Sequence, residues 1–401
     1  MNIAYVCNYL GPQFLRKYCG DKSFSISATL KSTAIIRAFL HAGHQVTVFS
    51  PGINVCNRYI KKHEETVNFQ EGKVRIIYSN ILSFRKMSFF NSFSLKRTIR
   101  KTNVNENFDI LLFYNVTFDA ALNLHTFKNK IKILEYEDNI FNKALRGKKN
   151  NGEWFKEQLF NFVIKRTNAS IIVGKNMLKD NTSLTKVHIP GAINEDVLDN
   201  ISFDMKKWDG LFPVKISLAG GVHYSKGADL IIKALDYIDF PVELNFYGSG
   251  SFDDYTSNLL QNCPKRHLVI NNGYVAHNEL IKILSQDSHI LINSTRNMGV
   301  EANSEGYPFK MLEYAATGRP IVSSTIGRLD DDFNKCISFY DTEDPQDIAD
   351  AIKKVVRNYN TYSEYAFNLQ KRVVDEYSVV GISKKIKQFI YQINDNGRYN
   401  H

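Results

Sequence analysis

The sequence has few cysteines and none of the spacings that make them structural. Its 401 residues include five, which are Cys7, Cys19, Cys56, Cys263 and Cys336. The number is odd and no C-x-x-C pair occurs, which argues against a disulfide framework or a zinc site and favours a reducing compartment. No apolar run approaches the ~18 residues of a membrane-spanning helix, and no secretory leader is visible at the N-terminus. We therefore expect a cytoplasmic protein.

Acidic residues are scarce in the first half of the chain. Residues 1–200 carry 29 Lys and Arg against 16 Asp and Glu, whereas residues 201–401 carry 22 against 25. This excess predicts that the first half meets an anionic partner, although a solvated lysine-rich surface is the alternative. Zinc-finger spacing, RNP-type aromatic segments and basic–heptad junctions are all missing, so we do not expect a nucleic-acid partner.

The chain is too long for one core, because a single core rarely grows beyond ~250–300 residues. Strands alternate with amphipathic helices in both halves, which is typical of parallel sheets. Strands are predicted at 3–6, 44–49, 74–78, 110–114, 131–135 and 170–173, then at 214–218, 243–247, 268–271 and 289–292, and a loop is predicted over 8–27. We therefore predict an α/β fold of two Rossmann-like, doubly wound domains that face each other across a cleft, with ligands at the carboxyl ends of the strands.

The join between the domains is expected in the polar stretch Asn194–Phe212. The predicted domains are residues 1–195 and 210–375, and residues 376–401 contain an amphipathic helix near 381–393 that could pack back on the first domain. No G-x-G-x-x-G follows the first strand, so a dehydrogenase is not indicated, and the Gly-Ser-Gly at 248–250 is a weak signal.

The segment 301–320 is the most informative part of the sequence. Pro308 suits the first position of a helix and Gly318 the position after its end, which predicts a helix over 308–317. The first backbone N–H groups of this helix, together with one lysine side chain, would favour an anion; the residues are Phe309, Lys310 and Met311. Glu305 precedes the helix, and Glu313 lies five residues inside it, about 7.5 Å along the axis. A sugar, a diphosphate and a ribose would fit this order, although a solvated helix with incidental glutamates is the alternative.

Two glutamates separated by seven residues, followed by Tyr-Ala-Ala-Thr-Gly-Arg-Pro, resemble the signature of the retaining glycosyltransferase family 4, which has the GT-B fold. Residues 220–227 resemble the family's Gly-Arg-x-x-x-x-Lys-Gly loop, and residues 272–280 its base-binding turn. Residues 187–192 are similar to its approach to the domain linker. The resemblance covers most of the chain and is strongest over 216–326.

The resemblance implies a role for each matching residue. Glu305 would hold hydroxyls of the donor sugar, Glu313 would hold the ribose, and Lys226 would neutralise charge on the diphosphate leaving group. The backbone at 309–311 would share that charge, and the base would lie against Tyr274, Val275 and Leu280. A donor phosphate oxygen would take the acceptor proton in such enzymes. Neither a metal nor another cofactor is implied.

This sequence departs from the family pattern at two places. Gly221 stands where the family has an arginine, which removes one cation from the diphosphate site. Arg296 or Lys310 could replace that cation, although Arg296 could equally be a surface residue. The family's first-domain histidine falls at Glu137, which with Asp138 could orient an acceptor hydroxyl or act as a base. A strand-end turn is the alternative there.

The basic first half offers two candidate contacts for an acceptor. Lys22 could touch an acceptor phosphate. Residues 81–101 contain six basic residues and no acid, interleaved with Phe84, Met87, Phe89, Phe90 and Phe93. This stretch could lie on an anionic leaflet, on the inner face of the plasma membrane. Alternatively, its aromatic residues pack on the first-domain sheet.

The sequence therefore predicts an enzyme that moves a hexose, with retention, from a UDP- or GDP-sugar to a glycan or lipid-linked acceptor in bacterial polysaccharide synthesis. Residues 1–195 would bind the acceptor and residues 210–375 the nucleotide-sugar. The alternative is a non-catalytic GT-B subunit that binds a nucleotide-sugar or a partner glycosyltransferase. An epimerase on this fold would need an acid/base set that we do not find.

Overall fold

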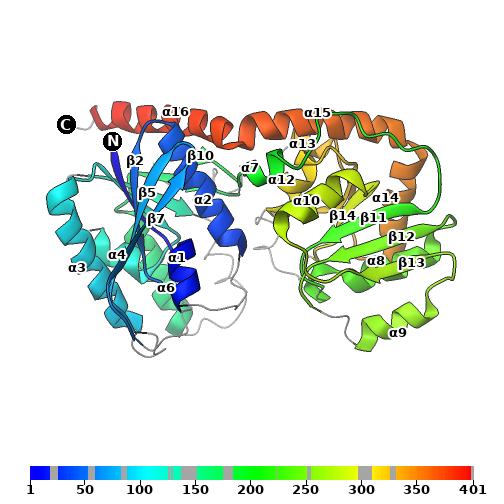
Figure 1. The fold of residues 1–401 in the computed structure, drawn as a ribbon, viewed down its shortest axis with the longest axis horizontal. Coiled ribbons are helices and arrows are strands. Elements are labelled where there is room, and N and C mark those ends of the chain that lie inside the picture. The colour runs from blue at the N-terminus through cyan, green and yellow to red at the C-terminus, as the bar shows by residue number, and fades with distance from the viewer. Residues whose placement is uncertain are drawn as a thin grey trace. The chain divides into compact units, whose positions relative to one another are not determined.

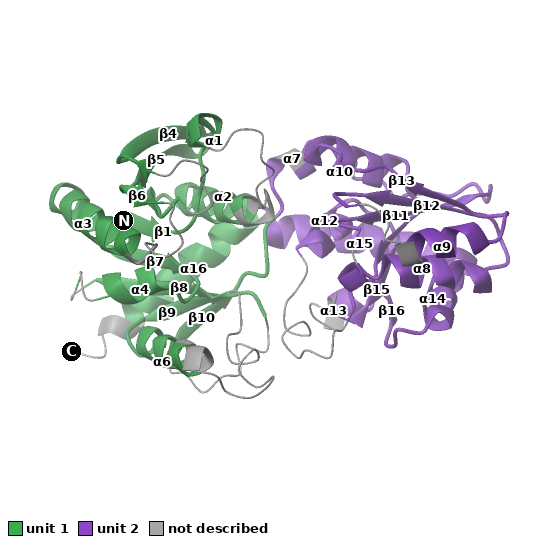
Figure 2. Cartoon of the chain, turned by 90° about the horizontal axis from the view of Figure 1, so that it is seen from below, with its two compact units in different colours: residues 1–192, 379–401 green, residues 193–378 purple. Residues whose placement is uncertain are grey.

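The chain forms two compact units in the computed structural model. The residues that the structure describes are 1–18, 26–52, 59–82, 88–124, 127, 130–136, 151–174, 184–222, 224–250, 254–296, 309–325 and 331–398. Unit 1 contains residues 1–192 and 379–401, and unit 2 contains residues 193–378 (Figure 2). These boundaries lie three residues from the positions 195 and 376 at which the sequence analysis divided the chain.

Unit 1 is built on a twisted sheet that is parallel except for one edge strand (Figure 1). In spatial order its strands are β10 (Thr185–His188), β9 (Ala169–Ile172), β8 (Ile131–Tyr136), β7 (Ile110–Tyr114), β1 (Asn2–Val6), β2 (Gln45–Ser50), β5 (Gly72–Tyr78) and β4 (His63–Phe69). The central strands are continuous apolar runs such as Ile-Leu-Leu-Phe-Tyr in β7, because helices cover both faces of the sheet. A two-stranded ribbon, β3 (Tyr59–Ile60) with β6 (Ile81–Leu82), completes the unit.

The helices of unit 1 form two layers. One layer packs on the sheet through α2 (Ile26–His41) and the final helix α16 (Val379–Arg398), which contact each other. The other layer contains α3 (Ser88–Glu106), α4 (Phe118–Asn123) and α6 (Asn151–Ile164). The final segment therefore completes the first core, because Ile382, Ile386 and Phe389 are buried in it.

The prediction of a loop over residues 8–27 is wrong in part. Helix α1 (Pro12–Tyr18) lies within it. The carboxylate of Glu65, on β4, accepts hydrogen bonds from the backbone N–H groups of Gln13 and Phe14 at 2.9 and 3.4 Å. A helix whose first turn is capped by a residue fifty positions away has no local capping signal.

Unit 2 contains a fully parallel six-stranded sheet. In spatial order its strands are β13 (Leu268–Asn271), β12 (Val242–Tyr247), β11 (Val214–Ala219), β14 (Ile290–Asn293), β15 (Ile321–Ser324) and β16 (Ser338–Tyr340). The α/β class and the Rossmann-like character of both units are thus confirmed. The order of the strands reverses between β11 and β14, and ligands bind at such switch points.

Helices cover both faces of this second sheet. Helices α8 (Ala228–Ala234) and α14 (Pro345–Arg357) pack on one face, and α10 (His277–Gln286), α12 (Lys310–Ala316) and α15 (Tyr359–Tyr377) on the other. Three further helices are α7 (Glu195–Leu198), α9 (Asp254–Asn262) and α13 (Asp331–Asn334). None of the described helices of either unit combines the length and the apolar character needed to cross a bilayer.

Candidate active site in unit 2

Lys226 is held at the switch point of the unit 2 sheet. It ends the short 3₁₀ turn Tyr224–Lys226 that follows β11, and residues 294–296 follow β14. The Ser294 hydroxyl donates to the Lys226 carbonyl at 2.5 Å, and the Arg296 N–H donates to the carbonyl of Ser225 at 3.1 Å. Gly227 has φ +69°, and a Cβ there would lie 2.2 Å from the Ser294 carbonyl oxygen. Only glycine allows the two loops to approach this closely.

Gly248 allows a second close approach of backbones. The Gly220 N–H donates to the Tyr247 carbonyl at 2.8 Å, so the loop after β11 runs beside the loop after β12. Gly248 has φ +155°, and a Cβ there would lie 2.0 Å from the Gly220 carbonyl oxygen. The Gly-Ser-Gly pattern therefore serves packing. Gly221, in the position of the family's arginine, lies in this partly exposed loop.

Helix α12 presents two charged residues on one face and buries the other. Lys310 and Glu313 are three residues apart and therefore share a face, while Tyr314 is fully buried. The Tyr314 hydroxyl accepts a hydrogen bond from the Ala219 N–H at 2.7 Å, which ties α12 to the end of β11. Burial raises the pKa of the Tyr314 hydroxyl well above its ordinary value. The helix is described from Lys310 to Ala316, preceded by Phe309.

The ammonium group of Lys310 is buried without a hydrogen-bond acceptor among the described residues. Its Nζ is shielded from solvent and lies 6.0 Å from the centre of the Tyr314 ring. Burial, and secondly the charge of Lys226, lower the pKa of Lys310 to about 7. Across the described ranges of the chain, neither lysine has a carboxylate within ion-pair distance. Two neighbouring cations without a counter-ion form a site suited to an anion.

Glu313 is hydrogen-bonded to a residue that the sequence analysis did not single out. The His277 Nε2 atom lies 2.7 Å from Glu313 Oε1, and the two side chains are 23% and 14% exposed. His277 is the first residue of α10 and follows the turn at 272–276. A single histidine in Val-Ala-His-Asn-Glu carries no periodic or spacing signal, so only the structure could bring it to Glu313.

The predicted base-binding turn exposes one aromatic ring. Tyr274 is 67% exposed, whereas Val275 and Leu280 are half-buried against the core of unit 2. The Gly248 N–H donates to the Gly273 carbonyl at 2.7 Å, so the turn lies beside the end of β12. In this turn, contacts to a base are therefore available from the Tyr274 ring and from the backbone.

Arg296 is not a surface residue. It is 4% exposed, and its guanidinium donates to Asp229 at 2.8 Å and stacks on the Tyr224 ring at 3.6 Å. Glu343 lies 3.4 Å from its Nε atom. Because Arg296 already has carboxylate partners and Lys310 has none within the described part of the chain, Lys310 is the better candidate to replace the family's arginine at position 221.

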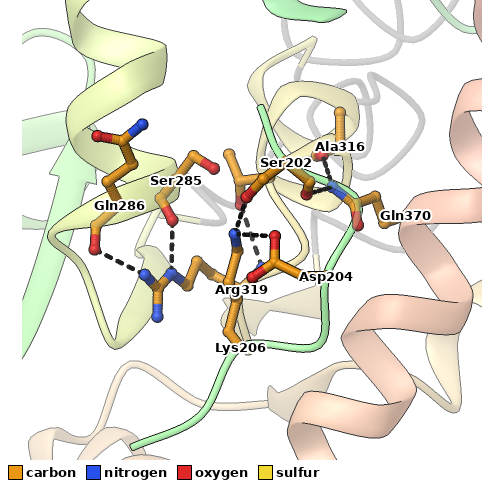
Figure 3. A network of polar contacts seen from close by, with 9 residues as sticks. Ser202, Asp204, Lys206, Ser285, Gln286, Ala316, Arg319 and Gln370 are labelled. Carbon is orange, nitrogen blue, oxygen red and sulfur yellow. Dashed lines mark hydrogen bonds and ion pairs between the residues drawn. The ribbon is translucent and has the colours of Figure 1, made fainter. Parts of the chain in front are cut away.

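A polar network anchors α10 and α12 at their C-terminal ends (Figure 3). The Arg319 guanidinium donates to the last two carbonyls of α10, those of Ser285 and Gln286, at 2.9 and 2.7 Å. The Gln370 amide donates to the Ala316 carbonyl at the end of α12, at 2.7 Å. These bonds fix the C-terminal ends of the helices that carry His277 and Glu313 and so restrict the movement of both side chains.

Four predicted site residues lie outside the described residues: Glu305, Glu137, Asp138 and Lys22. The structure therefore brings together Lys226, Lys310, Glu313 and the turn around Tyr274, all in unit 2. Within the described part of the chain, no group of three or more His, Cys, Asp or Glu side chains is arranged to hold a metal ion.

Unit 1 contains a buried ion pair near the predicted acceptor residues. Glu135, at the end of β8, is fully buried; it lies 3.3 Å from Lys31 Nζ and accepts a hydrogen bond from the Tyr5 hydroxyl. Burial, and secondly this carboxylate, raise the pKa of the Tyr5 hydroxyl and of the Cys7 thiol. The sequence feature that indicates this ion pair is a lysine, Lys31, on the apolar face of α2.

The match to a known sequence family lies within unit 2, the unit that contains this site. Residues 213–358 match the sequence family described as glycosyl transferases group 1. This stretch is similar to the group 1 glycosyltransferases. An uncharacterised glycosyltransferase of Methanocaldococcus jannaschii is 26% identical over 174 residues, which are 42% of this chain and 43% of that protein. The chain thus spans less than half the length of the curated relative that it matches.

Solved glycosyltransferase structures share the fold of the whole chain. A glycosyltransferase from Rickettsia africae has a TM-score of 0.67 at 16% identity and covers 98% of this chain and 99% of its own. HepE of Anabaena, solved in complex with UDP, has a TM-score of 0.61 at 12% identity and covers 98% of this chain and 100% of its own. At these identities the likeness shows the fold, which is that of GT-B glycosyltransferases.

Proposed function

We propose that the chain is a retaining glycosyltransferase of the family 4 type, which takes a hexose from a nucleoside-diphosphate sugar bound in unit 2. The acceptor is a glycan or a lipid-linked glycan that meets unit 1. The observation that carries the proposal is the pair Lys226 and Lys310, two neighbouring cations at the switch point of the sheet that have no counter-ion among the residues the structure describes. A diphosphate supplies the missing negative charge.

The remaining residues of the site fit the other parts of such a donor. Glu313 offers a carboxylate to the hydroxyls of a ribose, and the exposed Tyr274 ring lies in the turn suited to a base. The same Anabaena HepE was also solved with UDP-glucose, and this relative supports a UDP-linked hexose as the first donor to test. The resemblance of Glu305 to the first glutamate of the family signature assigns it the sugar hydroxyls.

In the proposed reaction the bond from the sugar carbon to the diphosphate oxygen breaks, the acceptor oxygen forms a bond to the same carbon on the same face, and negative charge develops on the departing diphosphate. Lys226 and Lys310 neutralise that charge where it grows, which lowers the barrier more than it strengthens ground-state binding. A donor phosphate oxygen accepts the acceptor proton, so the chain supplies no nucleophile. No metal or other cofactor takes part in this proposal.

Contact with an anionic membrane is a separate proposal that concerns α3. Leu95 and Ile99 are buried in the core of unit 1, so that face of the helix packs on the sheet. Phe90 and Phe93 are exposed, beside exposed basic residues at 97, 100 and 101. This smaller surface is the one that an anionic leaflet would meet. Residues 83–87, with Phe84 and Met87, lie outside the described residues.

Donor binding and donor cleavage test the proposal together. We would screen UDP-, GDP- and ADP-sugars by thermal shift and by release of the nucleoside diphosphate. We expect one donor to bind and to hydrolyse slowly. Glu305→Gln and Lys226→Ala should each abolish most of the hydrolysis and keep the melting temperature of the wild type. Wild-type rates in either variant would refute the site.

The same screen separates the enzyme from the alternative, a non-catalytic subunit. Such a subunit could bind a donor, but it would cleave none, even when candidate glycan acceptors are added. The replacement of the family's arginine by Gly221 is the observation that favours this alternative. Turnover with any acceptor would exclude it.

A further inference from the structure

The hydrogen bond between His277 and Glu313 joins the turn proposed for the base to the carboxylate proposed for the ribose. We propose that His277 is a positioning residue: it fixes the Glu313 carboxylate in the orientation that accepts the ribose hydroxyls of a nucleoside diphosphate. This inference rests on the proposed function, since it deepens the description of the same site.

The direction of the bond follows from the chemistry of the two groups. An ionised carboxylate only accepts, so the imidazole donates through Nε2–H to Glu313 Oε1 at 2.7 Å. This bond occupies one oxygen of the carboxylate. The other oxygen keeps its lone pairs, and a ribose presents two adjacent hydroxyl donors. A carboxylate with one oxygen already bound has a defined plane, so a ligand does not have to restrict its rotation on binding.

Helix α10, which starts at His277, is anchored at its C-terminal end. Arg319 binds its last two carbonyls, those of Ser285 and Gln286 (Figure 3). Tyr314, next to Glu313, is buried and bonded to Ala219 at the end of β11. Both residues of the hydrogen bond therefore lie on helices that other hydrogen bonds hold in place, which a positioning role requires. Neither side chain is fully buried, so a ligand can reach them.

Removing His277 should have different effects on melting temperature and nucleotide affinity, depending on whether the hydrogen bond only stabilises the fold or also positions Glu313. If His277 only stabilised unit 2, its removal would lower the melting temperature and weaken every nucleotide by the same factor. If it orients Glu313 toward ribose hydroxyls, its removal should weaken a ribonucleotide more than the corresponding 2′-deoxyribonucleotide. The difference between the two ligands is therefore the decisive measurement.

The experiment measures the binding of UDP, dUDP, GDP and dGDP by calorimetry to the full chain and to three variants. The variants are His277→Ala, His277→Gln and the control Lys282→Ala, which alters an exposed residue of the same helix. For the ribonucleotide that the wild type binds, we expect His277→Ala to weaken binding about five- to tenfold, which is the net worth of one ordinary hydrogen bond. Its effect on the deoxy ligand should be clearly smaller.

His277→Gln should restore most of the affinity, because its amide N–H can donate to the same carboxylate oxygen. Lys282→Ala should match the wild type. An equal loss for the ribo and deoxy ligands, or no loss at all, would overturn the positioning role while nucleotide binding by the wild type stands. If the wild type binds neither UDP nor GDP, the proposed function itself fails and this inference fails with it.

Discussion

Lys310→Met should make the protein more stable and a weaker binder of nucleoside diphosphates. Burial lowers the pKa of Lys310 to about 7, whereas an exposed lysine in the unfolded chain titrates near ~10.4. Between these pH values the unfolded state binds more protons than the folded state, so the stability of the wild type rises with pH over that range. At pH 7 this difference lowers the free energy of unfolding by on the order of 4 kcal/mol, because each unit of pKa difference is worth about 1.4 kcal/mol.

Methionine has a similar length and no charge, so Lys310→Met should recover much of this free energy at pH 7 and little at pH 10. Urea denaturation monitored by circular dichroism across this pH range measures the effect. Lys282→Met, at an exposed position of α10, is the matched control and should change stability little. A variant less stable than the wild type at pH 7 would mean that Lys310 packs as a satisfied group, and the reasoning would fail.

The same residue should couple nucleotide binding to proton uptake. A diphosphate favours the charged lysine, so the wild type should take up about half a proton per ligand at pH 7 and about one proton at pH 9. Its affinity should fall about fiftyfold over these two pH units. Calorimetry in two buffers with different ionisation heats measures the uptake. Equal uptake and equal affinity in Lys310→Met would refute a contact between Lys310 and the diphosphate.

Three other predictions concern the supports of the two units. Arg319→Ala should cost about 2–4 kcal/mol in urea denaturation, because it leaves two carbonyls at the end of α10 without donors; an unchanged midpoint would contradict the anchoring role. Glu135→Ala should cost about 3–5 kcal/mol, because it removes the carboxylate of a buried ion pair and the acceptor of the Tyr5 hydroxyl, and a loss below 1 kcal/mol would refute this. On α3, Leu95→Ala should lower the free energy of unfolding by about 2–5 kcal/mol, because it leaves a cavity in the core. Phe90→Ser should leave the free energy of unfolding unchanged. If α3 meets membranes, Phe90→Ser should reduce sedimentation with anionic vesicles.

The strands were predictable from the sequence because most of them are buried on both faces. Of the ten predicted strands, β7 and β13 have the expected bounds, and the other eight differ by one or two residues at their ends. Six of the described strands were not predicted: β3, β4, β6, β10, β15 and β16. Strand β4 was missed because this antiparallel edge strand carries the polar run His-Glu-Glu-Thr. Helix α1 was missed because its cap, Glu65, comes from that same strand. Both errors arise where a partner far along the chain determines the local structure.

The placement of the candidate residues was predictable where a motif fixed their spacing. Lys226 follows β11, and Lys310 and Glu313 share one face of α12, with Lys310 close enough to Lys226 to feel its charge. His277 could not be found in this way, because its relation to Glu313 exists only after α10 and α12 pack together. The burial of Arg296 beside Asp229 was also invisible, since the two residues are 67 positions apart.

The contribution of α16 to the first core has a consequence for biosynthesis. Unit 2 is one continuous segment, and its two ends are paired through the hydrogen bond from the Ile193 N–H to the Tyr377 carbonyl at 2.7 Å. All the residues of unit 2 therefore emerge from the ribosome in one stretch. Unit 1 is synthesised first but cannot close its core until Val379–Arg398 emerges. The first unit to begin translation is then the last to be completed.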